Sequence, residues 1–229
     1  MVETAVRCVP GPLDRYRRRV STTPAPDHDA ASSGGAVDTA PVREYKTMIT
    51  WRGVGVDRLE QVRMHVSGLR IKAYGRIIAA ATDESEAFSA SYELITNEVG
   101  VTKRLSIHLL RESGESQLGL SHDDENLWLV RTDGDTIRSD FDGAQDVDLA
   151  MSPMFNALPI RRFGMRTEPT DIDIPVAYVY LPEGDVKPAR MHYTSGPDGI
   201  DVVSPVATAK ITVDENGFVV NYSGLAERV

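Results

Sequence analysis

Apolar and polar residues alternate along most of this chain from Met48 onward, and this pattern limits the fold more than any other feature. A period of two places successive side chains on opposite faces of a β-strand. In residues 69–80, LRIKAYGRIIAA, the apolar Ile71, Ala73 and Ile77 share one face. The same alternation recurs in residues 86–95, EAFSASYELI, and in residues 104–110, RLSIHLL. Shorter stretches of this kind continue to residue 222, so the pattern predicts many strands.

Turn sequences separate these predicted strands. Asp133-Gly134 and Asn216-Gly217 suit the positive φ angles of two-residue hairpin turns, and residues 195–199, SGPDG, form another turn signal. Short turns join neighbouring strands in opposite directions. We therefore predict an antiparallel all-β domain with few helices.

The first part of the chain lacks this alternation. Residues 21–42, STTPAPDHDAASSGGAVDTAPV, are rich in small and polar residues and offer little apolar surface to bury. We predict a disordered tail over residues 1–46 and a folded domain over residues 47–229. The basic run Tyr16–Val20, YRRRV, suits a small nucleic-acid or membrane-surface patch, but we favour a solvated basic stretch.

Charge and cysteine content restrict the partners and the compartment. The chain of 229 residues has a net charge of −9, which argues against nucleic acid and anionic surfaces as partners. Cys8 is the only cysteine, which suits a reducing compartment. Residues 1–20 contain no apolar run of a translocated leader, and we see no integral membrane segment. We expect a cytoplasmic protein, and the sequence leaves its oligomeric state open.

Catalytic signatures are absent from the sequence. It contains no G-x-S-x-G, no P-loop and no G-x-G-x-x-G, and its histidines do not pair at the spacing of metal ligands. We therefore predict a protein that is not an enzyme, with no cofactor and no metal.

Residues 148–165, DLAMSPMFNALPIRRFGM, combine an apolar run with two prolines and two arginines. Ser152 and Pro153 form a helix start signal, and Pro159 is expected to end the helix early. Asp146 and Asp148 precede this run on a predicted strand. They suit a metal ion or a sugar hydroxyl, but we favour a structural pair with Arg161 or Arg162.

Longer stretches resemble a known family. The sequences DGAQDVDLAMSPMFNALPIRRFGM, IDIPVAYVYLPEGDVKPARMHYT and ITVDENGFVVNYSGLAERV, with TWRG at residues 50–53, are similar to the bacterial family of putative glycolipid-binding domains. The resemblance covers residues 48–229. It implies a curved antiparallel sheet forming a half-open barrel or β-roll around an apolar space, with at most one or two short helices.

This resemblance suggests non-catalytic binding of a lipid-like, glycolipid-like or fatty-acid-like amphipathic ligand in an apolar groove. The roll is then expected to enclose a space bordered by Ala73, Gly75, Ala90 and Tyr178. The candidate ligand-binding residues are Met154, Phe155, Arg161, Arg162, Tyr178, Tyr180 and Tyr92.

Two alternatives stay open at this stage. The first is that the same side chains fill a core with no cavity. The second is a protein-interaction or regulatory scaffold without a small ligand.

Overall fold

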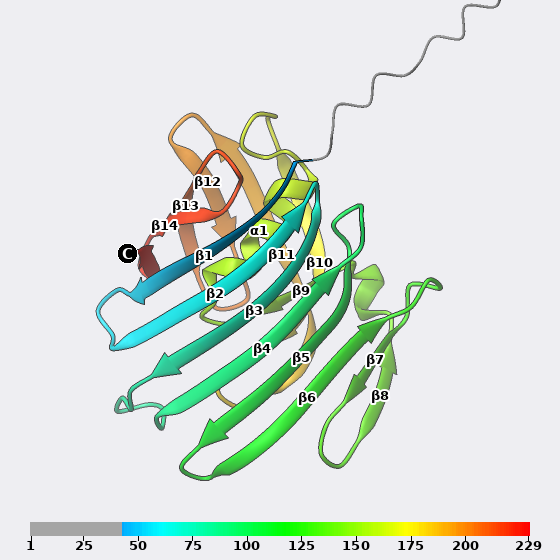
Figure 1. The fold of residues 1–229 in the computed structure, drawn as a ribbon, viewed down its shortest axis with the longest axis vertical. Helices are drawn as coiled ribbons and strands as arrows, with labels where there is room; N and C mark the ends of the chain where they lie inside the picture. Colours follow the sequence, from blue (N-terminus) through cyan, green and yellow to red (C-terminus); the bar gives the residue numbers. More distant parts are fainter. Residues whose placement is uncertain (1–42) are drawn as a thin grey trace, which may run out of the picture. The chain divides into compact units, whose positions relative to one another are not determined.

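A computed structural model of the chain describes residues 43–229, and within this range a single sheet of 15 strands curls around one α-helix (Figure 1). The strands of its first half are β1 (Glu44–Gly53), β2 (Arg58–Ser67), β3 (Arg70–Ala79), β4 (Phe88–Thr96), β5 (Thr102–Arg111), β6 (Gly114–His122), β7 (Trp128–Arg131) and β8 (Thr136–Ser139). The elements of its second half are the 3₁₀-helix η1 (Phe141–Gly143), β9 (Asp146–Leu149), α1 (Pro153–Arg162), β10 (Asp171–Val179), β11 (Val186–Gly196), β12 (Gly199–Val203), β13 (Thr208–Val213), β14 (Val219–Tyr222) and β15 (Ala226–Arg228).

The sheet consists of two meanders joined where β1 pairs with β15, and its edges are β8 and β9. All neighbouring strands are antiparallel except β9 and β10, which run parallel. The expectation of a fully antiparallel sheet was wrong at this pair. A parallel pair requires a crossover connection, and α1 provides it between β9 and β10.

The predicted fold class is confirmed: the structure is mostly β, with one large curved open sheet and no closed barrel. Alternating burial follows the alternating sequence, as in β3, where Ile71, Ala73 and Ile77 are buried. The predicted turns at residues 133–134, 197–198 and 216–217 join consecutive strands.

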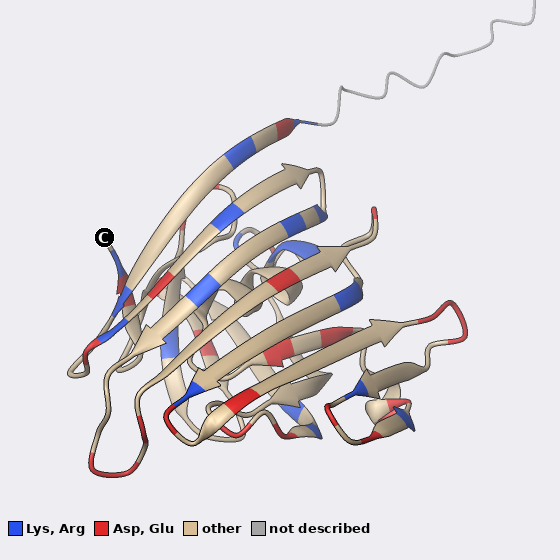
Figure 2. Ribbon diagram, turned by 60° about the horizontal axis from the view of Figure 1, so that its bottom comes forward, with Lys and Arg blue, Asp and Glu red and all other residues tan. Residues whose placement is uncertain are grey.

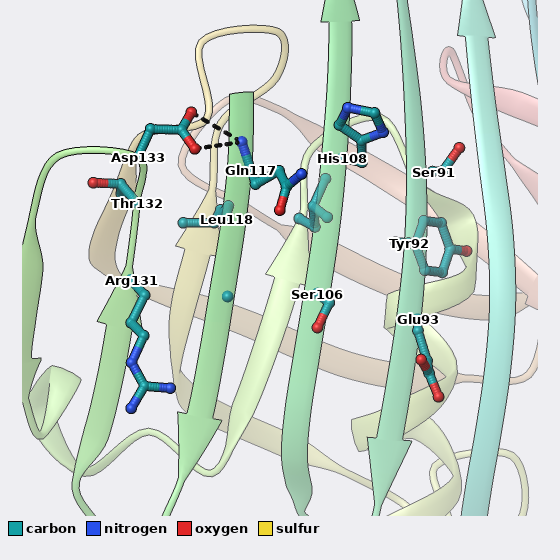
Figure 3. Close-up of a pocket in the computed structure, with 12 residues that line it drawn as sticks. Ser91, Tyr92, Glu93, Ser106, His108, Gln117, Leu118, Arg131, Thr132 and Asp133 are labelled. Atoms are coloured by element: carbon teal, nitrogen blue, oxygen red, sulfur yellow. Dashed lines mark hydrogen bonds between the residues drawn. The ribbon is translucent and has the colours of Figure 1, made fainter. Parts of the chain in front are cut away.

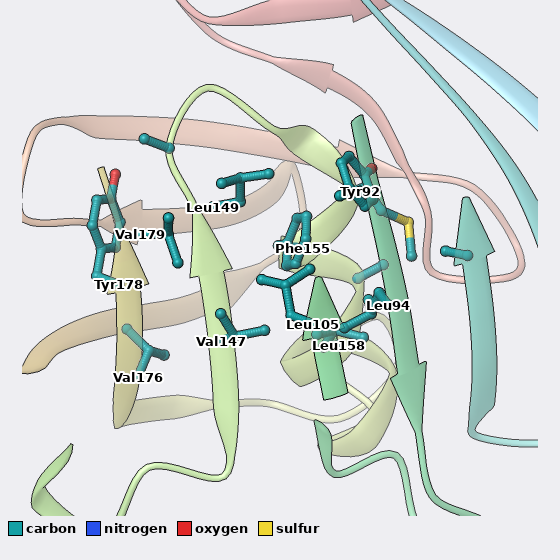
Figure 4. Close-up of a cluster of buried hydrophobic side chains, with 14 of the residues drawn as sticks. Tyr92, Leu94, Leu105, Val147, Leu149, Phe155, Leu158, Val176, Tyr178 and Val179 are labelled. Atoms are coloured by element: carbon teal, nitrogen blue, oxygen red, sulfur yellow. The ribbon is translucent and has the colours of Figure 1, made fainter. Parts of the chain in front are cut away.

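Helix α1 lies on the inner side of the curled sheet. Its residues 153–160 are all buried, as expected of a helix enclosed on every side. Figure 4 shows Phe155 and Leu158 of α1 in one cluster of buried side chains with Leu105 of β5 and Val147 of β9. The ring of Phe155 packs on the ring of Tyr92 with centroids 5.2 Å apart. The core of the domain is therefore formed by α1 and both halves of the sheet.

The interior space expected beside Ala73, Gly75 and Ala90 is filled by the protein's own side chains, so this prediction was wrong. Ala73 and Ala90 are fully buried. A Cβ atom added at Gly75 would lie 2.1 Å from Cζ of Tyr92, so the glycine makes room for that ring. The small inward-facing residues accommodate α1 and Tyr92.

Pro159 does not end α1 early, contrary to the sequence-based expectation. The helix continues to Arg162, and the Phe163 amide donates a hydrogen bond to the Pro159 carbonyl over 2.9 Å. Proline removes one helical hydrogen bond, at a cost of about 3 kcal/mol. The burial of apolar side chains before and after Pro159 offsets this cost.

The first strand begins at Glu44, ahead of the predicted domain start at residue 47. The predicted disordered tail lies outside the described residues, apart from its last few positions, which belong to β1 and pair with β2. Within residues 43–229, the one α-helix is too short to cross a lipid bilayer.

Residues Glu44–Thr47 pair with β2, and Tyr45 packs against the core. We predict that a chain beginning at Met48 is less stable than one beginning at Arg43 by about 2 kcal/mol, because the first four of the ten residues of β1 are lost. For a domain of this size the thermal midpoint should fall by about 4–8 °C. Calorimetry on both chains measures the difference, and equal midpoints would show that the start of β1 contributes nothing.

Candidate functional site

Arg162, at the end of α1, forms a two-pronged ion pair with Asp146 of β9. Its Nη1 and Nη2 atoms donate to Oδ1 and Oδ2 of Asp146 over 2.6 and 2.5 Å. The Asp146 side chain is 1% exposed and that of Arg162 is 11% exposed. Burial raises the pKa of Asp146, and Arg162 opposes this rise. The predicted pair between the arginines and the aspartates is confirmed for these two residues.

Arg161, the other arginine considered for the pair with Asp146 or Asp148, contacts backbone carbonyls instead. Its guanidinium donates to the backbone carbonyls of Asn216 and of Gly68, the latter over 2.6 Å. It also lies over the ring of Phe218, 5.0 Å from the centroid. Arg161 therefore connects α1 to the β2–β3 turn and to the β13–β14 turn.

Glu60 of β2 is a buried carboxyl at the start of α1. It points inward, and its Oε1 atom accepts hydrogen bonds from Tyr92 Oη over 2.6 Å and Ser152 Oγ over 2.5 Å. Ser152 thus bonds to Glu60 rather than capping its own helix. Burial raises the pKa of Glu60 to about 7, against the opposing effect of the two hydroxyls.

A cavity of about 200 Å³ lies next to this group, between the start of α1, β9, β10 and the turns that follow β12 and β14. Its polar lining includes Asp148, Asn156, Tyr178 and Tyr222. Burial raises the pKa of Asp148 to about 7, and the nearby carboxyls of Asp146 and Glu60 add to the rise. The Asp148 carboxyl accepts a hydrogen bond from the Leu149 backbone amide, and in the described range no side chain hydrogen-bonds to it or to the hydroxyls of Tyr178 and Tyr222. These groups are available to a ligand.

The apolar part of the same cavity is formed by Leu149, Met151, Met191, Val206 and Leu225. Met151 has a φ angle of +67°, which is strained for a residue with a side chain. The strain occurs where the chain turns from β9 into α1. Strained backbone costs free energy and persists only where the surrounding structure holds it in place. Such residues are found most often at functional sites.

Met151 also borders a second hollow, a groove of about 530 Å³ at the ends of β1 to β4. Val56, Ala80 and Phe88 supply apolar surface there, and Asp57, Asp83 and Glu84 also line it. The Met151 side chain therefore contributes to both the polar cavity and the apolar groove. Both hollows have polar and apolar lining residues, and the Asp148 cavity is distinguished by its buried carboxyl.

The outer face of the sheet carries another hollow, of about 550 Å³, which spans β4 to β7 (Figure 3). Ser91, Ser106 and Gly119 contribute to its surface, and His108 and Arg131 lie around them. It lacks a buried charged group, since its charged side chains lie on the solvent side of the strands. The Asp148 cavity is therefore the stronger candidate site.

The structure distributes the predicted ligand-binding residues over several places. Tyr178 lines the Asp148 cavity. The ring of Tyr180 packs edge-on against the ring of Tyr178, with centroids 4.8 Å apart. Met154, Phe155 and Tyr92 are buried in the core. Arg161 and Arg162 make the contacts described above. Ligand binding by these residues stays a prediction.

Glu60 and the cavity role of Asp148 were missed by the sequence analysis. A signal for Glu60 exists, because it occupies the same strand face as Val62, Met64 and Val66. An acidic residue at an apolar position of a strand indicates a buried polar contact or a site.

The described residues form a curled β-roll with an internal helix and a polar cavity at the start of that helix. The family model described as "Putative glycolipid-binding" matches residues 48–228, and the chain belongs to this family. The crystal structure of a DUF1089 family protein from Pseudomonas aeruginosa has the same fold, with a TM-score of 0.62 and 24% identity. That match covers 78% of this chain and 95% of the other. No curated protein matches the chain significantly.

Replacing Arg162 by Ala should lower the free energy of unfolding by about 3–5 kcal/mol, because it leaves the buried Asp146 carboxylate without its partner. The double variant Arg162→Met with Asp146→Leu should lose less than this single variant. Urea denaturation measures both. Arg166→Ala, at an exposed arginine nearby, serves as the control. A loss below about 1 kcal/mol for Arg162→Ala would mean that the pair is no stronger than a surface contact.

The raised pKa of Asp148 predicts that stability falls with rising pH. The folded protein holds this pKa at about 7, whereas the unfolded chain has about 3.9. Between these values the folded state binds more protons, so its stability declines as the pH rises from about 4 to 7. Asp148→Asn should therefore be more stable than the original protein at pH 8 and show a flatter profile. Urea midpoints from pH 5 to 8 test this, with the exposed Asp142→Asn as control.

Proposed function

We propose that this protein binds a glycolipid-like amphipathic ligand without transforming it. The sugar head group occupies the Asp148 cavity, and the hydrocarbon chain passes Met151 into the apolar groove. This places the head group on a buried carboxyl and two tyrosine hydroxyls, and the chain on Val56, Ala80 and Phe88.

The observation that carries this proposal is the free hydrogen-bonding capacity of Asp148. A buried carboxyl without a partner side chain lowers stability at neutral pH, and stability alone gives no reason to keep it. Sugar hydroxyls donate hydrogen bonds to carboxylates and accept them from tyrosine. A ligand with several hydroxyls therefore satisfies Asp148, Tyr178 and Tyr222 together.

The sizes of the two hollows support a ligand in two parts. The polar cavity, at about 200 Å³, is smaller than the 300–1,000 Å³ typical of pockets for whole ligands. It suits a small head group. The groove on the other side of Met151 has about 530 Å³ and suits a flexible chain. Methionine adapts its shape easily, so Met151 can contact both parts of the ligand.

The family description supports glycolipid as the ligand class. Binding without catalysis is part of the proposal: the Ser152 hydroxyl donates to the Glu60 carboxyl at the edge of the cavity, and we assign this contact to joining α1 to β2. Cytoplasmic location and the absence of a nucleic-acid partner stay predictions. The alternative, an interaction scaffold without a small ligand, leaves the unpartnered groups of the cavity unexplained.

Octyl β-glucoside, kept below its micellar concentration, is a suitable probe because it joins a sugar to a short chain. Calorimetric titration should show saturable binding. Asp148→Asn should weaken this binding about tenfold, the effect of losing a hydrogen bond to a charged group. Ala207→Trp, at the cavity lining, should block it, and Asp142→Asn should leave it unchanged.

Native mass spectrometry of gently purified protein complements the titration. A copurified lipid agrees with the proposal, whereas a second protein chain and no lipid agree with the scaffold. Binding that persists in folded Asp148→Asn and Ala207→Trp would contradict the proposed site, and no binding of octyl β-glucoside or copurified lipid would contradict the function.

A further inference from the structure

The outer face of β1 to β3 has a charge opposite to that of the chain. Six basic residues point outward from these three strands: Lys46, Arg52, Arg63, Arg70, Lys72 and Arg76. Glu44 is the one outward-facing acidic residue on the same strands. This surface, called the outer patch here, therefore carries a net charge of about +5 in a chain of net charge −9. Figure 2 shows the basic segments on these strands.

Part of this charge lacks an acidic partner. Arg70 pairs with Glu98 over 3.2 Å, and Lys72 pairs with Glu93 over 3.4 Å. Among the described residues, Lys46, Arg52 and Arg63 have no carboxylate within ion-pair distance. Arg52 lies opposite Glu227 of β15 in the strand register, whereas Lys46 and Arg63 have no acidic residue opposite them on a neighbouring strand.

Large apolar side chains are exposed between the basic ones. Met48 is 58% exposed and Ile78 is 54% exposed, and Leu59 and Tyr74 are also exposed. The strand register places Arg63 between Met48 and Tyr74, and Leu59 between Arg52 and Ile78. All of these except Arg52 line a groove of about 400 Å³. Basic and apolar side chains are thus neighbours across β1, β2 and β3 on this face.

We propose that the outer patch docks on an anionic lipid surface. Lipid head groups with negative charge attract the unpaired cations, and the exposed apolar side chains enter the interface beneath them. A nucleic acid would use the cations but would leave Met48, Leu59 and Ile78 exposed to water. The combination favours a membrane surface over a nucleic acid.

The position of the outer patch fits a role in ligand exchange. Leu59 and Ile78 lie near the ends of β2 and β3, where Val56 and Ala80 line the apolar groove. The turns at that end carry Asp57, Asp83 and Glu84. Their negative charges repel anionic lipid, so the turns themselves do not contact the membrane. The protein therefore approaches the membrane with the strand face, and the groove opening lies near the lipid. Docking does not depend on the proposed glycolipid site.

Flotation of the full chain with lipid vesicles tests the proposal. The protein should bind vesicles of phosphatidylcholine with 30% phosphatidylglycerol, bind much less to phosphatidylcholine alone, and dissociate at high salt. Arg52→Gln with Arg63→Gln should reduce the partition coefficient about fivefold for each cation removed. Leu59→Ser with Ile78→Ser should reduce it further, because apolar burial is lost.

The matched control is Arg190→Gln with Lys210→Gln, which removes the same charge from exposed positions on β11 and β13. All variants keep residues 1–42 with their basic run, so a difference between the two pairs reports on the outer patch. Equal binding by both pairs, no preference for anionic vesicles, or tighter binding to an oligonucleotide than to vesicles would overturn the proposal. Octyl β-glucoside titration of the same variants should be unchanged, which separates this surface from the ligand site.

Discussion

Helix α1 is enclosed by a single sheet, and the need to satisfy its polar groups inside that sheet determines the rest of the structure. An apolar helix gains stability from burial on all sides, but its ends and polar side chains also lose contact with water. The chain solves this at each end with a long-range contact. Glu60 of β2 bonds to Ser152 before the helix, and Asp146 of β9 bonds to Arg162 at its end. Arg161 adds contacts to the turns of both halves of the sheet. The helix thus connects strands that are far apart in sequence.

The candidate site is a consequence of the same arrangement. The turn from β9 into α1 must reverse the chain inside the roll, and Met151 adopts a positive φ angle there. This turn leaves Asp148 buried close to Asp146 and Glu60, so that repulsion and burial together raise its pKa. Asp146 is satisfied by Arg162, but Asp148 faces the cavity instead. A closely packed core would have used an apolar residue at this position. The carboxyl is explained by a ligand with hydroxyl groups, which is why the proposed function rests on it.

The sequence predicted most of the fold and part of the site, for identifiable reasons. Alternation sets the face of each strand, so the buried positions of β3 to β5 followed directly. The contact between Arg162 and Asp146 was predictable because two charges flank an apolar helix that must be buried. The position of the cavity was not predictable from the sequence. Small inward-facing residues such as Ala73, Gly75 and Ala90 leave room either for an empty space or for a neighbouring side chain. At Gly75 the neighbour is Tyr92. The extension of α1 past Pro159 depends on burial from both halves of the sheet, which no local pattern reveals.

Net charge was the least informative feature, because the fold separates the charges by position. Three acidic residues, Glu60, Asp146 and Asp148, are buried, while six cations face outward on β1 to β3. The register of the strands produces this outcome, since residues of one parity turn toward α1 and residues of the other parity turn toward solvent. Long-range attraction to a partner depends on the local face rather than on the total, because salt screens charges more than about 8–10 Å away. A chain with an overall charge of −9 can therefore present a cationic face, and the same alternation that builds the sheet creates that face.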